Sequence, residues 1–207
     1  MDNVQETAGG FGEFALIERL RGKLRSSDNP DVVVGIGDDA AIIDAGGGKC
    51  WVISCDVQVQ GTHFPAAGVS GFSVGHKALA VNVSDVAAMG GTPRFALISL
   101  GVSEDTPLTF LDEIYEGMNE KAENWDVVVL GGNVTRTEGP FFIDVFVVGM
   151  MERENILRRD GAKVGDQILV TGHLGSAAAG LFLLNHPEMK SKVSDETHTA
   201  LTFAQLR

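Results

Sequence analysis

The sequence predicts an α+β fold, in which helices cover a mixed β-sheet, followed by the beginning of an incomplete second, α/β domain. Short apolar runs with the spacing of strands alternate with two substantial helical patterns through the first part of the chain. A charged stretch, residues 152–163, then separates this part from a second apolar block. We therefore expect one domain at residues 1–151 and only the start of another at residues 152–207, which is short for an independent core.

Composition narrows the class of protein. The chain has 207 residues, of which 44% are hydrophobic, and a formal net charge of −12 at pH 7. This charge argues against nucleic acid as a partner, because a phosphate backbone attracts a basic surface. The longest apolar run, residues 141–151, is interrupted by Asp144 and is too short to cross a membrane.

Two features predict a cytoplasmic location. Residues 1–12 have neither the basic nor the apolar region of a signal peptide. The two cysteines of the sequence, Cys50 and Cys55, fit neither a metal-finger spacing nor a disulfide framework. A reducing compartment suits such a chain.

The first elements follow from the periodicity of apolar residues. Residues 14–24 have the pattern of a helix, residues 32–34 that of a short strand, and residues 51–56 that of a strand with alternating faces. Residues 75–89 predict a longer helix, which Gly90-Gly91 should end.

The later elements are read in the same way. Thr106 is expected to cap a second long helix, with Pro107 in its first turn. A further helix should follow Gly172. Strands are expected at residues 95–102, 127–130, 141–149 and 168–171.

Two adjacent carboxylates, Asp38 and Asp39, follow the first predicted strand and two glycines. Neighbouring negative charges repel each other unless a cation lies beside them. A solvated acidic turn is the simpler interpretation, because Gly and Asp are common turn residues. A magnesium site is the alternative, because hard cations bind carboxylate oxygens.

Three further polar clusters occur at the ends of apolar runs or within them. Ser54-Cys55-Asp56 ends a predicted strand and precedes His63, which could hold an anionic group or simply be solvated. Asp85 interrupts an apolar helix, where a carboxylate either faces water or needs a partner. Gly131-Gly132-Asn133 is expected to form a turn whose free N–H groups could cradle phosphate, or an ordinary loop.

The remaining motifs point to phosphate chemistry. Arg159, in an Arg-Arg-Asp-Gly sequence, could clamp a phosphate, although a surface charge run is the default interpretation. The loop at residues 172–177 opens a helix whose N-terminus could bind an anion. We find no nucleophile with its own base, so the set suits phosphoryl transfer, in which the protein positions the reactants and Mg²⁺ neutralises charge.

These motifs, taken in order, resemble the thiamine-monophosphate kinase family, within the superfamily of aminoimidazole ribonucleotide synthetase. The ordered set is specific although each motif alone is weak, and the resemblance covers nearly the whole chain. The matching motifs are Gly12-Glu13-Phe14-Ala15-Leu16-Ile17, Gly35-Ile36-Gly37-Asp38-Asp39-Ala40, Ser54-Cys55-Asp56, Gly61-Thr62-His63-Phe64, Lys77-Ala78-Leu79-Ala80-Val81-Asn82-Val83-Ser84-Asp85, Gly131-Gly132-Asn133, Arg159-Asp160-Gly161-Ala162 and Thr171-Gly172-His173-Leu174-Gly175.

The resemblance implies a fold like that of aminoimidazole ribonucleotide synthetase and the ATP-dependent phosphorylation of thiamine monophosphate to thiamine diphosphate. It implies direct transfer of the γ-phosphoryl group, and a homodimer formed through an N-terminal domain, residues 1–151, that binds ATP and Mg²⁺. The implied roles are metal binding at Asp38, Asp39, Ser54, Cys55, Asp56, Asp85 and Asn133, ATP binding at Gly132, Asn133 and Arg159, and substrate binding at His63.

Two positions depart from the family pattern. Cys55 stands where the family usually has a threonine, and a thiol is a soft, poor ligand for Mg²⁺. Asn133 stands where many members have aspartate. The Asp-Ser-Asp-Gly-type and Gly-Gly-Glu-Asp-Tyr-type motifs of the family's second domain do not occur. We therefore expect this sequence to be part of a longer protein, with little turnover of its own.

Two other interpretations stay open. The chain could act on another substrate of the same superfamily, although His63 and the lack of a reactive N-terminal cysteine loop count against this. It could also be a non-catalytic module that binds nucleotide or thiamine phosphate. Dependence of activity on thiamine monophosphate separates the first from the leading hypothesis, and binding without turnover identifies the second.

Overall fold

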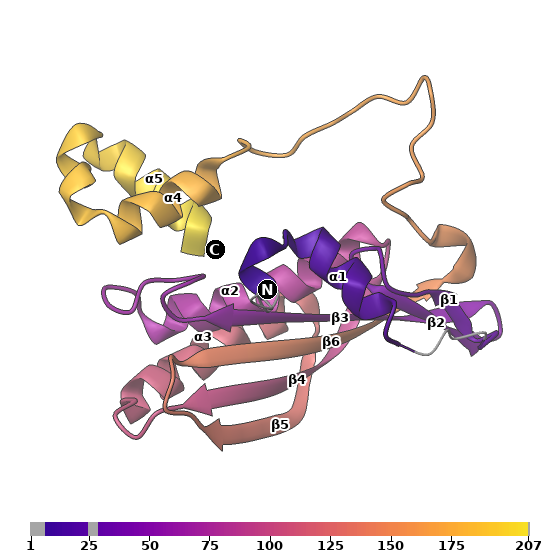
Figure 1. Cartoon of the computed structure of the whole chain (residues 1–207), viewed down its shortest axis with the longest axis horizontal. Coiled ribbons are helices and arrows are strands. Elements are labelled where there is room, and N and C mark those ends of the chain that lie inside the picture. Colours follow the sequence, from indigo (N-terminus) through magenta and orange to yellow (C-terminus); the bar gives the residue numbers. More distant parts are fainter. Residues whose placement is uncertain (1–6, 25–28, 207) are drawn as a thin grey trace, which may run out of the picture.

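The computed structural model describes residues 7–24 and 29–206 (Figure 1). The first half of the N-terminal stretch that lacks a signal-peptide pattern, residues 1–6, therefore lies outside the described residues. The described part contains six strands, β1 (Val32–Val34), β2 (Ala41–Gly46), β3 (Lys49–Val59), β4 (Thr92–Val102), β5 (Val128–Arg136) and β6 (Phe142–Glu152).

These strands form one sheet in the order β1-β2-β3-β6-β4-β5. The pair β4 and β5 is parallel, and the other neighbours are antiparallel. The parallel pair is connected by a helix, as such a pair requires. The mixed sheet predicted from the sequence is thus confirmed.

Helices cover one face of this sheet and form the C-terminal part of the chain. α2 and α3 lie behind the sheet in the view of Figure 1, and α1 lies beside β1 and β2. The helix bounds are α1 Glu13–Arg21, α2 Gly71–Ala88, α3 Leu108–Trp125, α4 Ser176–Asn185 and α5 Asp195–Leu206, with short 3-10 turns at Ala8–Gly10, Arg153–Asn155 and Pro187–Lys192.

The core lies between the sheet and α2. Strand β6 alternates between buried and half-buried residues along its length, as expected for a strand with one covered face. Ile143, Val145 and Val147 point into the core, where they meet Leu79 and Val86 of α2, and all five are fully buried. The helix predicted at residues 75–89 is therefore confirmed.

Helices α2 and α3 approach each other closely because glycines line their contact. A Cβ atom on Gly75 would lie 1.9 Å from the carbonyl oxygen of Ile114, and one on Gly117 would lie 1.9 Å from that of Phe72. No side chain fits at such a separation, so each glycine allows one helix backbone to rest on the other.

Two predicted helix starts are corrected. α2 begins at Gly71, earlier than expected, because the Ser70 hydroxyl accepts the N–H of Ser73 at 3.2 Å and caps the helix. Thr106 does not cap α3. Its Oγ1 instead accepts the N–H of Ser103 at 3.1 Å, in the turn before the helix, and Pro107 stands at the cap position.

Two other predictions are wrong. Gly131, Gly132 and Asn133 do not form a turn, because β5 continues through them and pairs with β4 as far as Arg136. Residues 168–171 do not form a strand. Ile168 is 93% exposed, and an apolar run without a neighbouring strand cannot make the hydrogen bonds that a sheet requires.

The chain beyond β6 leaves the sheet as a long extended segment that ends in a pair of helices. Residues 156–175 contain no helix or strand, and Figure 1 shows them as the orange arc that leads to α4 and α5. Helix α5 returns to the sheet domain, where buried Gln205 donates a hydrogen bond to the carbonyl oxygen of His63 at 3.1 Å. Among the helices of the described residues, none is long and apolar enough to cross a membrane.

Candidate functional site

A cleft of about 470 Å³ brings together polar residues from five separate parts of the sequence. They come from α1, from the connection before β2, from β3, from α2, and from the segment after β6. The polar residues that line the cleft are Glu13, Asp38, Asp39, Ser54, Cys55, Asp56, Asp85 and Arg159.

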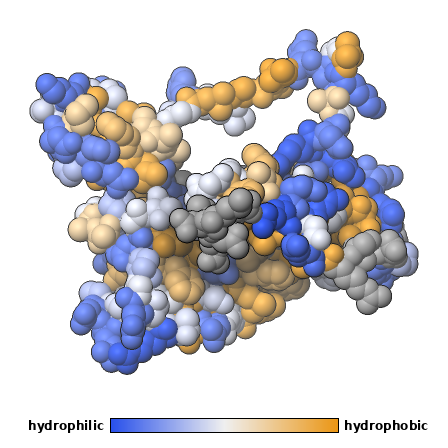
Figure 2. Space-filling model, in the orientation of Figure 1, coloured by the Kyte–Doolittle hydropathy of each residue, from blue (hydrophilic) through white to orange (hydrophobic). Residues whose placement is uncertain are grey.

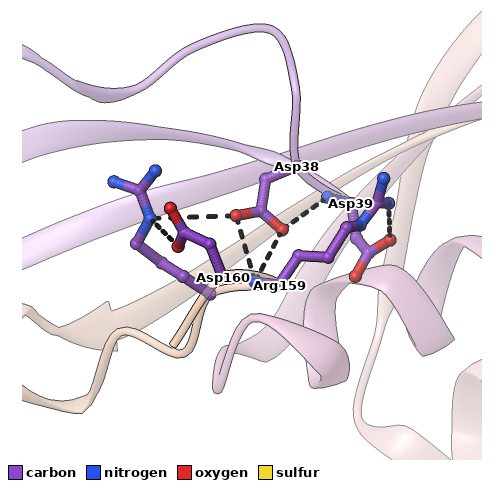
Figure 3. Close-up of polar contacts among 5 residues, drawn as sticks. Asp38, Asp39, Arg159 and Asp160 are labelled. Carbon is purple, nitrogen blue, oxygen red and sulfur yellow. Dashed lines mark hydrogen bonds and ion pairs between the residues drawn. The ribbon is translucent and has the colours of Figure 1, made fainter. Parts of the chain in front are cut away.

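The acidic pair sits between β1 and β2, and its two carboxylates have different partners. Gly37, with a φ of +129°, turns the chain so that Asp38 and Asp39 follow in the bend. The side chain of Asp38 is only 4% exposed, and it accepts the backbone N–H of Asp39 at 3.0 Å. The Asp39 carboxylate is turned toward Arg159, with which it forms an ion pair (Figure 3).

Strand β3 and helix α2 hold the other two carboxylates. The Ser54 hydroxyl donates to Asp85 Oδ2 at 2.8 Å. Asn82, one turn before Asp85, has no exposed surface, and its Oδ1 accepts the N–H of Asp56 at 2.8 Å. These contacts fix the side of β3 that carries Ser54 and Asp56 against the side of α2 that carries Asp85.

The cleft disfavours ionised carboxylates when no cation is present. Loss of solvent raises the pKa of Asp56, and the nearby Asp85 raises it further. Loss of solvent also raises the pKa of Asp85, while its hydrogen bond from Ser54 opposes this. Nearby positive groups, His63 for Asp56 and Arg159 for Asp85, lower these pKa values but do not outweigh the loss of solvent.

Arg159 supplies the positive charge at the rim of the cleft. Its guanidinium forms the ion pair with Asp39, and its backbone N–H lies 3.3 Å from both Asp38 oxygens. The hydrogen bond with Asp39 is the main reason why the pKa of Arg159 is raised. Its side chain is half exposed, so it can leave Asp39 for another anion.

Cys55 points to the opposite face of β3 from Ser54 and behaves as a neutral thiol. Its Sγ donates to Asp144 Oδ1 at 3.2 Å. Burial is the first cause that raises the pKa of Cys55, to about 11, and the Asp144 hydrogen bond is the next. A protonated thiol is a poor ligand for Mg²⁺, so the structure adds a physical reason to the doubt that the sequence raised.

The residues of the cleft fit Mg²⁺ only in part. Within residues 7–24 and 29–206, no three His, Cys, Asp or Glu side chains form a group that could hold a metal ion. Mg²⁺ is, however, usually bound by one or two carboxylates together with phosphate oxygens and water. A bound cation would favour the ionised forms of Asp56 and Asp85, whose pKa values burial raises.

Two of the predicted nucleotide residues lie outside this cleft. Asn133 is on β5, where it pairs with Ser99 of β4, and Ser99 pairs in turn with Asp144 of β6. Directly paired residues share a face of a sheet, so a polar row crosses the sheet from Asn133 to Asp144 and reaches Cys55. Gly132 lies beside this row.

His63, the predicted substrate residue, also lies outside the cleft lining, in the loop after β3. Its Nδ1 accepts the N–H of Val59 at 3.0 Å, which leaves the hydrogen of the neutral ring on Nε2. Its carbonyl oxygen accepts Lys77 Nζ and Gln205 Nε2, both at 3.1 Å. Loss of solvent lowers the pKa of Lys77.

Sequence reasoning missed several residues that shape these sites. Asn82 could have been found, because it stands three residues before Asp85 on the same helix. Asp144 gave a weaker signal as the one charge within an apolar run. Gln205 gave none, because nothing local in the sequence indicates that α5 returns to the loop of His63.

A mixed six-stranded sheet with two helices on one face defines an α+β protein of the aminoimidazole ribonucleotide synthetase type. The family model "AIR synthase related protein, N-terminal domain" matches residues 37–151, and the chain belongs to this family. The match covers the sheet from the acidic pair to the end of β6, and with it most of the cleft.

Individual relatives indicate a more specific group within this family. The thiamine-monophosphate kinase of Bacillus subtilis is 40% identical over 89% of this chain and 56% of its own length. The thiamine-monophosphate kinase of Aquifex aeolicus is 40% identical over 84% of this chain and 53% of its own length. The chain thus spans little more than half the length of these two relatives.

Similar solved structures indicate the same group of kinases. A structure described as "AaThiL complexed with AMPPCP and TMP" superposes with a TM-score of 0.85 at 36% identity, over 99% of this chain and 62% of that one. The thiamine-monophosphate kinase crystal structure from Aquifex aeolicus gives 0.79 at 34% identity, over 98% and 62%. The predicted fold class and the resemblance to this family of kinases are confirmed.

Proposed function

We propose that this chain supplies the nucleotide- and metal-binding part of a thiamine-monophosphate kinase, which phosphorylates thiamine monophosphate to thiamine diphosphate with ATP. The observation that carries the proposal is the cleft that gathers Asp39, Asp56, Asp85 and Arg159 from four parts of the chain. The relatives of this chain bear the name of that enzyme, and one similar structure was solved with AMPPCP and TMP.

In this proposal the residues divide the work between metal and phosphate. Asp39, Asp56 and Asp85 would hold Mg²⁺ with one or two carboxylates for each ion, together with phosphate oxygens and water, and Ser54 orients Asp85 through its hydrogen bond. Bound Mg²⁺ would neutralise phosphate charge during transfer. Arg159 binds the phosphates of ATP by exchanging its carboxylate partner for a phosphate oxygen, to which a planar guanidinium donates equally well.

The remaining predicted residues have roles farther from the carboxylates. His63 directs its Nε2–H toward the substrate phosphate, because its Nδ1 is already bonded to Val59. Gly132 and Asn133 contact ATP from β5, where the polar row of the sheet ends. No residue is needed as a covalent nucleophile, since positioning and charge neutralisation account for most catalysis of this kind.

We also propose a homodimer, formed through the sheet face that α2 and α3 leave open. Apolar side chains gather on this face, shown in orange in Figure 2. Val57, Phe95 and Leu97 are each 37–42% exposed there, and a second copy would cover them. Light scattering should give about twice the chain mass of 21.9 kDa, whereas the mass of one chain would contradict the dimer.

A cytoplasmic location belongs to the same proposal. Both Cys50 and Cys55 are free thiols in the structure, as a reducing compartment would keep them.

Ligand binding and product formation together test the proposed function. We expect the chain to bind AMPPCP and thiamine monophosphate, and to prefer the latter to unphosphorylated thiamine. Turnover should be low, because the two motifs expected of a complete family member do not occur in the sequence. Failure to discriminate thiamine monophosphate from thiamine would contradict the substrate assignment.

A non-catalytic binding module is the second candidate. The observation that favours it is the protonated Cys55 thiol at a position that the resemblance assigns to a metal ligand. Cys55→Thr separates the two functions. A kinase site that also binds Mg²⁺ on the Asp144 side of β3 should gain Mg²⁺ affinity from the hydroxyl, whereas a module that does not use this position should be unaffected.

A further inference from the structure

The carboxylate of Asp38 is engaged by backbone amides rather than turned toward the other carboxylates. It accepts the N–H of Asp39 at 3.0 Å, and the N–H of Arg159 lies 3.3 Å from both of its oxygens. The side chain is 4% exposed. Figure 3 shows the contrast between the neighbours, with Asp38 directed at the backbone of Arg159 and Asp39 at its guanidinium.

The segment that carries Arg159 needs such a fixed point. It forms a tight turn in which the N–H of Gly161 donates to the carbonyl oxygen of Arg158 at 3.0 Å. The preceding anchor is the N–H of Leu157, which donates to the carbonyl oxygen of Met89 at 3.0 Å. Beyond the turn the chain is extended and exposed, as Val164 and Ile168 illustrate.

The two contacts of Arg159 have different consequences. An amide–carboxylate hydrogen bond fixes the backbone of Arg159 relative to the acidic corner. The half-exposed guanidinium can then move from Asp39 to a ligand phosphate while its Cα stays in place. Arg158 adds a second positive charge on the same side, because its Nε lies 3.9 Å from Asp38 Oδ2.

We propose that Asp38 is a positioning residue, which holds the backbone of Arg159 at the rim of the cleft so that the guanidinium reaches the nucleotide phosphates. Asp38 then contributes to nucleotide binding through Arg159 and is not a metal ligand. This inference rests on the proposed function, because it uses the assignment of Arg159 to phosphate.

Four variants test the proposal by separating metal affinity from nucleotide affinity. Asp38→Ala removes the acceptor, and Asp38→Asn keeps one oxygen that can accept an N–H. Asp39→Asn changes the proposed metal ligand next to it. Asp166→Ala is the matched control, because Asp166 accepts the N–H of Lys163 at 2.8 Å in the same segment without touching the acidic corner.

Three quantities are measured for each variant: AMPPCP affinity at saturating Mg²⁺, Mg²⁺ affinity without nucleotide, and hydrogen exchange at the Arg159 amide. We expect Asp38→Ala to lower AMPPCP affinity on the order of tenfold, to leave Mg²⁺ affinity within about twofold, and to speed Arg159 exchange. Asp38→Asn should recover part of the nucleotide affinity. Asp39→Asn should lower Mg²⁺ affinity, and Asp166→Ala should change none of the three.

The proposal is overturned if Asp38→Ala or Asp38→Asn lowers Mg²⁺ affinity as Asp39→Asn does, since Asp38 would then be a ligand. It is equally overturned if Asp38→Ala behaves like Asp166→Ala. Should Asp38→Ala not fold, Asp38→Asn decides by the same criteria. Absence of AMPPCP binding by the unmodified chain would instead contradict the proposed function, and exchange at the Arg159 amide would still decide whether Asp38 holds this segment.

Discussion

The side chain of Asn82 joins helix α2 to strand β3 at the point where the acidic residues meet. Its Oδ1 accepts the N–H of Asp56, and its Nδ2 donates to the carbonyl oxygens of Asp56 and Ala78, at 3.3 and 3.0 Å. Both the oxygen and the nitrogen of the Asn82 amide are therefore hydrogen-bonded to backbone atoms. A buried residue satisfied in this way sets the position of Asp56 relative to Asp85.

Asp85→Asn should stabilise the free protein at neutral pH. Loss of solvent raises the pKa of Asp85 in the folded protein, so its ionised form costs stability above that pKa. The cost disappears as the pH falls below the ordinary aspartate value, about 4. We therefore expect the variant to have a higher melting temperature at neutral pH and a shrinking advantage toward about pH 4.

The same variant should lose stabilisation by Mg²⁺, because a ligand that binds only the native state raises its stability. Thermal unfolding with and without Mg²⁺ measures both effects, with Asp112→Asn, on the exposed surface of α3, as the control. An equal Mg²⁺-induced rise for Asp85→Asn and the unmodified chain would count against Asp85 as part of the site.

Gln58→Leu should stabilise the fold by about 1 kcal/mol. Gln58 is 5% exposed, and its Oε1 has no hydrogen-bond partner in the structure. Gln60→Leu is the matched control and should destabilise, because Gln60 Oε1 accepts the N–H of Phe141 at 3.3 Å. Urea denaturation measures both, and changes of the same sign would show that the Oε1 of Gln58 is not the cause.

At the level of residues, the sequence predicted which carboxylates would gather. Asp39, Asp56 and Asp85 do line one cleft, although they are far apart in the chain. The sequence could not predict how neighbours divide their contacts. Asp38 and Asp39 are identical in type and adjacent, yet one bonds to backbone amides and the other to a guanidinium. That difference arises from the direction in which a single bend turns each side chain.

At the level of elements, β5 depends on a glycine. Gly132 has a φ of +157°, and a Cβ atom there would lie 1.7 Å from the carbonyl oxygen of Ile98 on β4. The parallel pairing of β4 and β5 therefore needs glycine at this position. β5 is exposed along its whole length, so its pairing with β4 is the main interaction that holds the strand in place.

Gly132→Ala should weaken this edge of the sheet by more than Gly131→Ala. Gly131 also has a positive φ, +144°, but a Cβ atom there meets nothing within 4 Å, so its substitution costs only the backbone strain of about 1–3 kcal/mol. The collision with Ile98 adds to that strain for Gly132. Denaturant unfolding and amide exchange along β5 measure the difference, and equal effects of the two substitutions would contradict it.

The position of the loop that contains His63 depends in the same way on helix α5. The carbonyl oxygen of His63 receives hydrogen bonds from Lys77 of α2 and from Gln205 of α5. Gln205→Met keeps the size of the side chain and removes its donor. We expect faster amide exchange in residues 61–64 and weaker binding of thiamine monophosphate, by a few-fold, with AMPPCP affinity unchanged.

Glu196→Gln, on the exposed side of α5, is the control for this change. Unchanged exchange at residues 61–64 in Gln205→Met would show that α5 does not hold the loop.

The elements of the sheet domain followed from local pattern, because alternation and helical spacing report directly on one buried face. The two wrong predictions of elements also have physical causes. Residues 168–171 have strand-like composition, but the described residues offer them no pairing strand. Gly131 and Gly132 look like a turn, but their missing side chains serve close strand pairing instead.

For the whole molecule, the site exists only because separate segments of the chain meet beside β3 and α2. Arg159 is 120 positions from Asp39 in sequence, and this separation is closed by their ion pair. No local pattern encodes such a meeting, so the sequence could suggest it only through the ordered resemblance to a family. Loss of solvent in the cleft raises the pKa values of Asp56 and Asp85, so a bound cation would favour their ionised forms.

The most direct test of the central claim is the affinity of the chain for AMPPCP, measured by calorimetry with Mg²⁺ and then with a chelator. The proposed site predicts that removal of Mg²⁺ lowers this affinity by at least about tenfold, because Asp39, Asp56 and Asp85 would repel the phosphates. It predicts the same loss in Mg²⁺ when Asp56 is changed to Asn. AMPPCP binding of equal strength with and without Mg²⁺ would contradict the claim that these carboxylates bind nucleotide through metal ions.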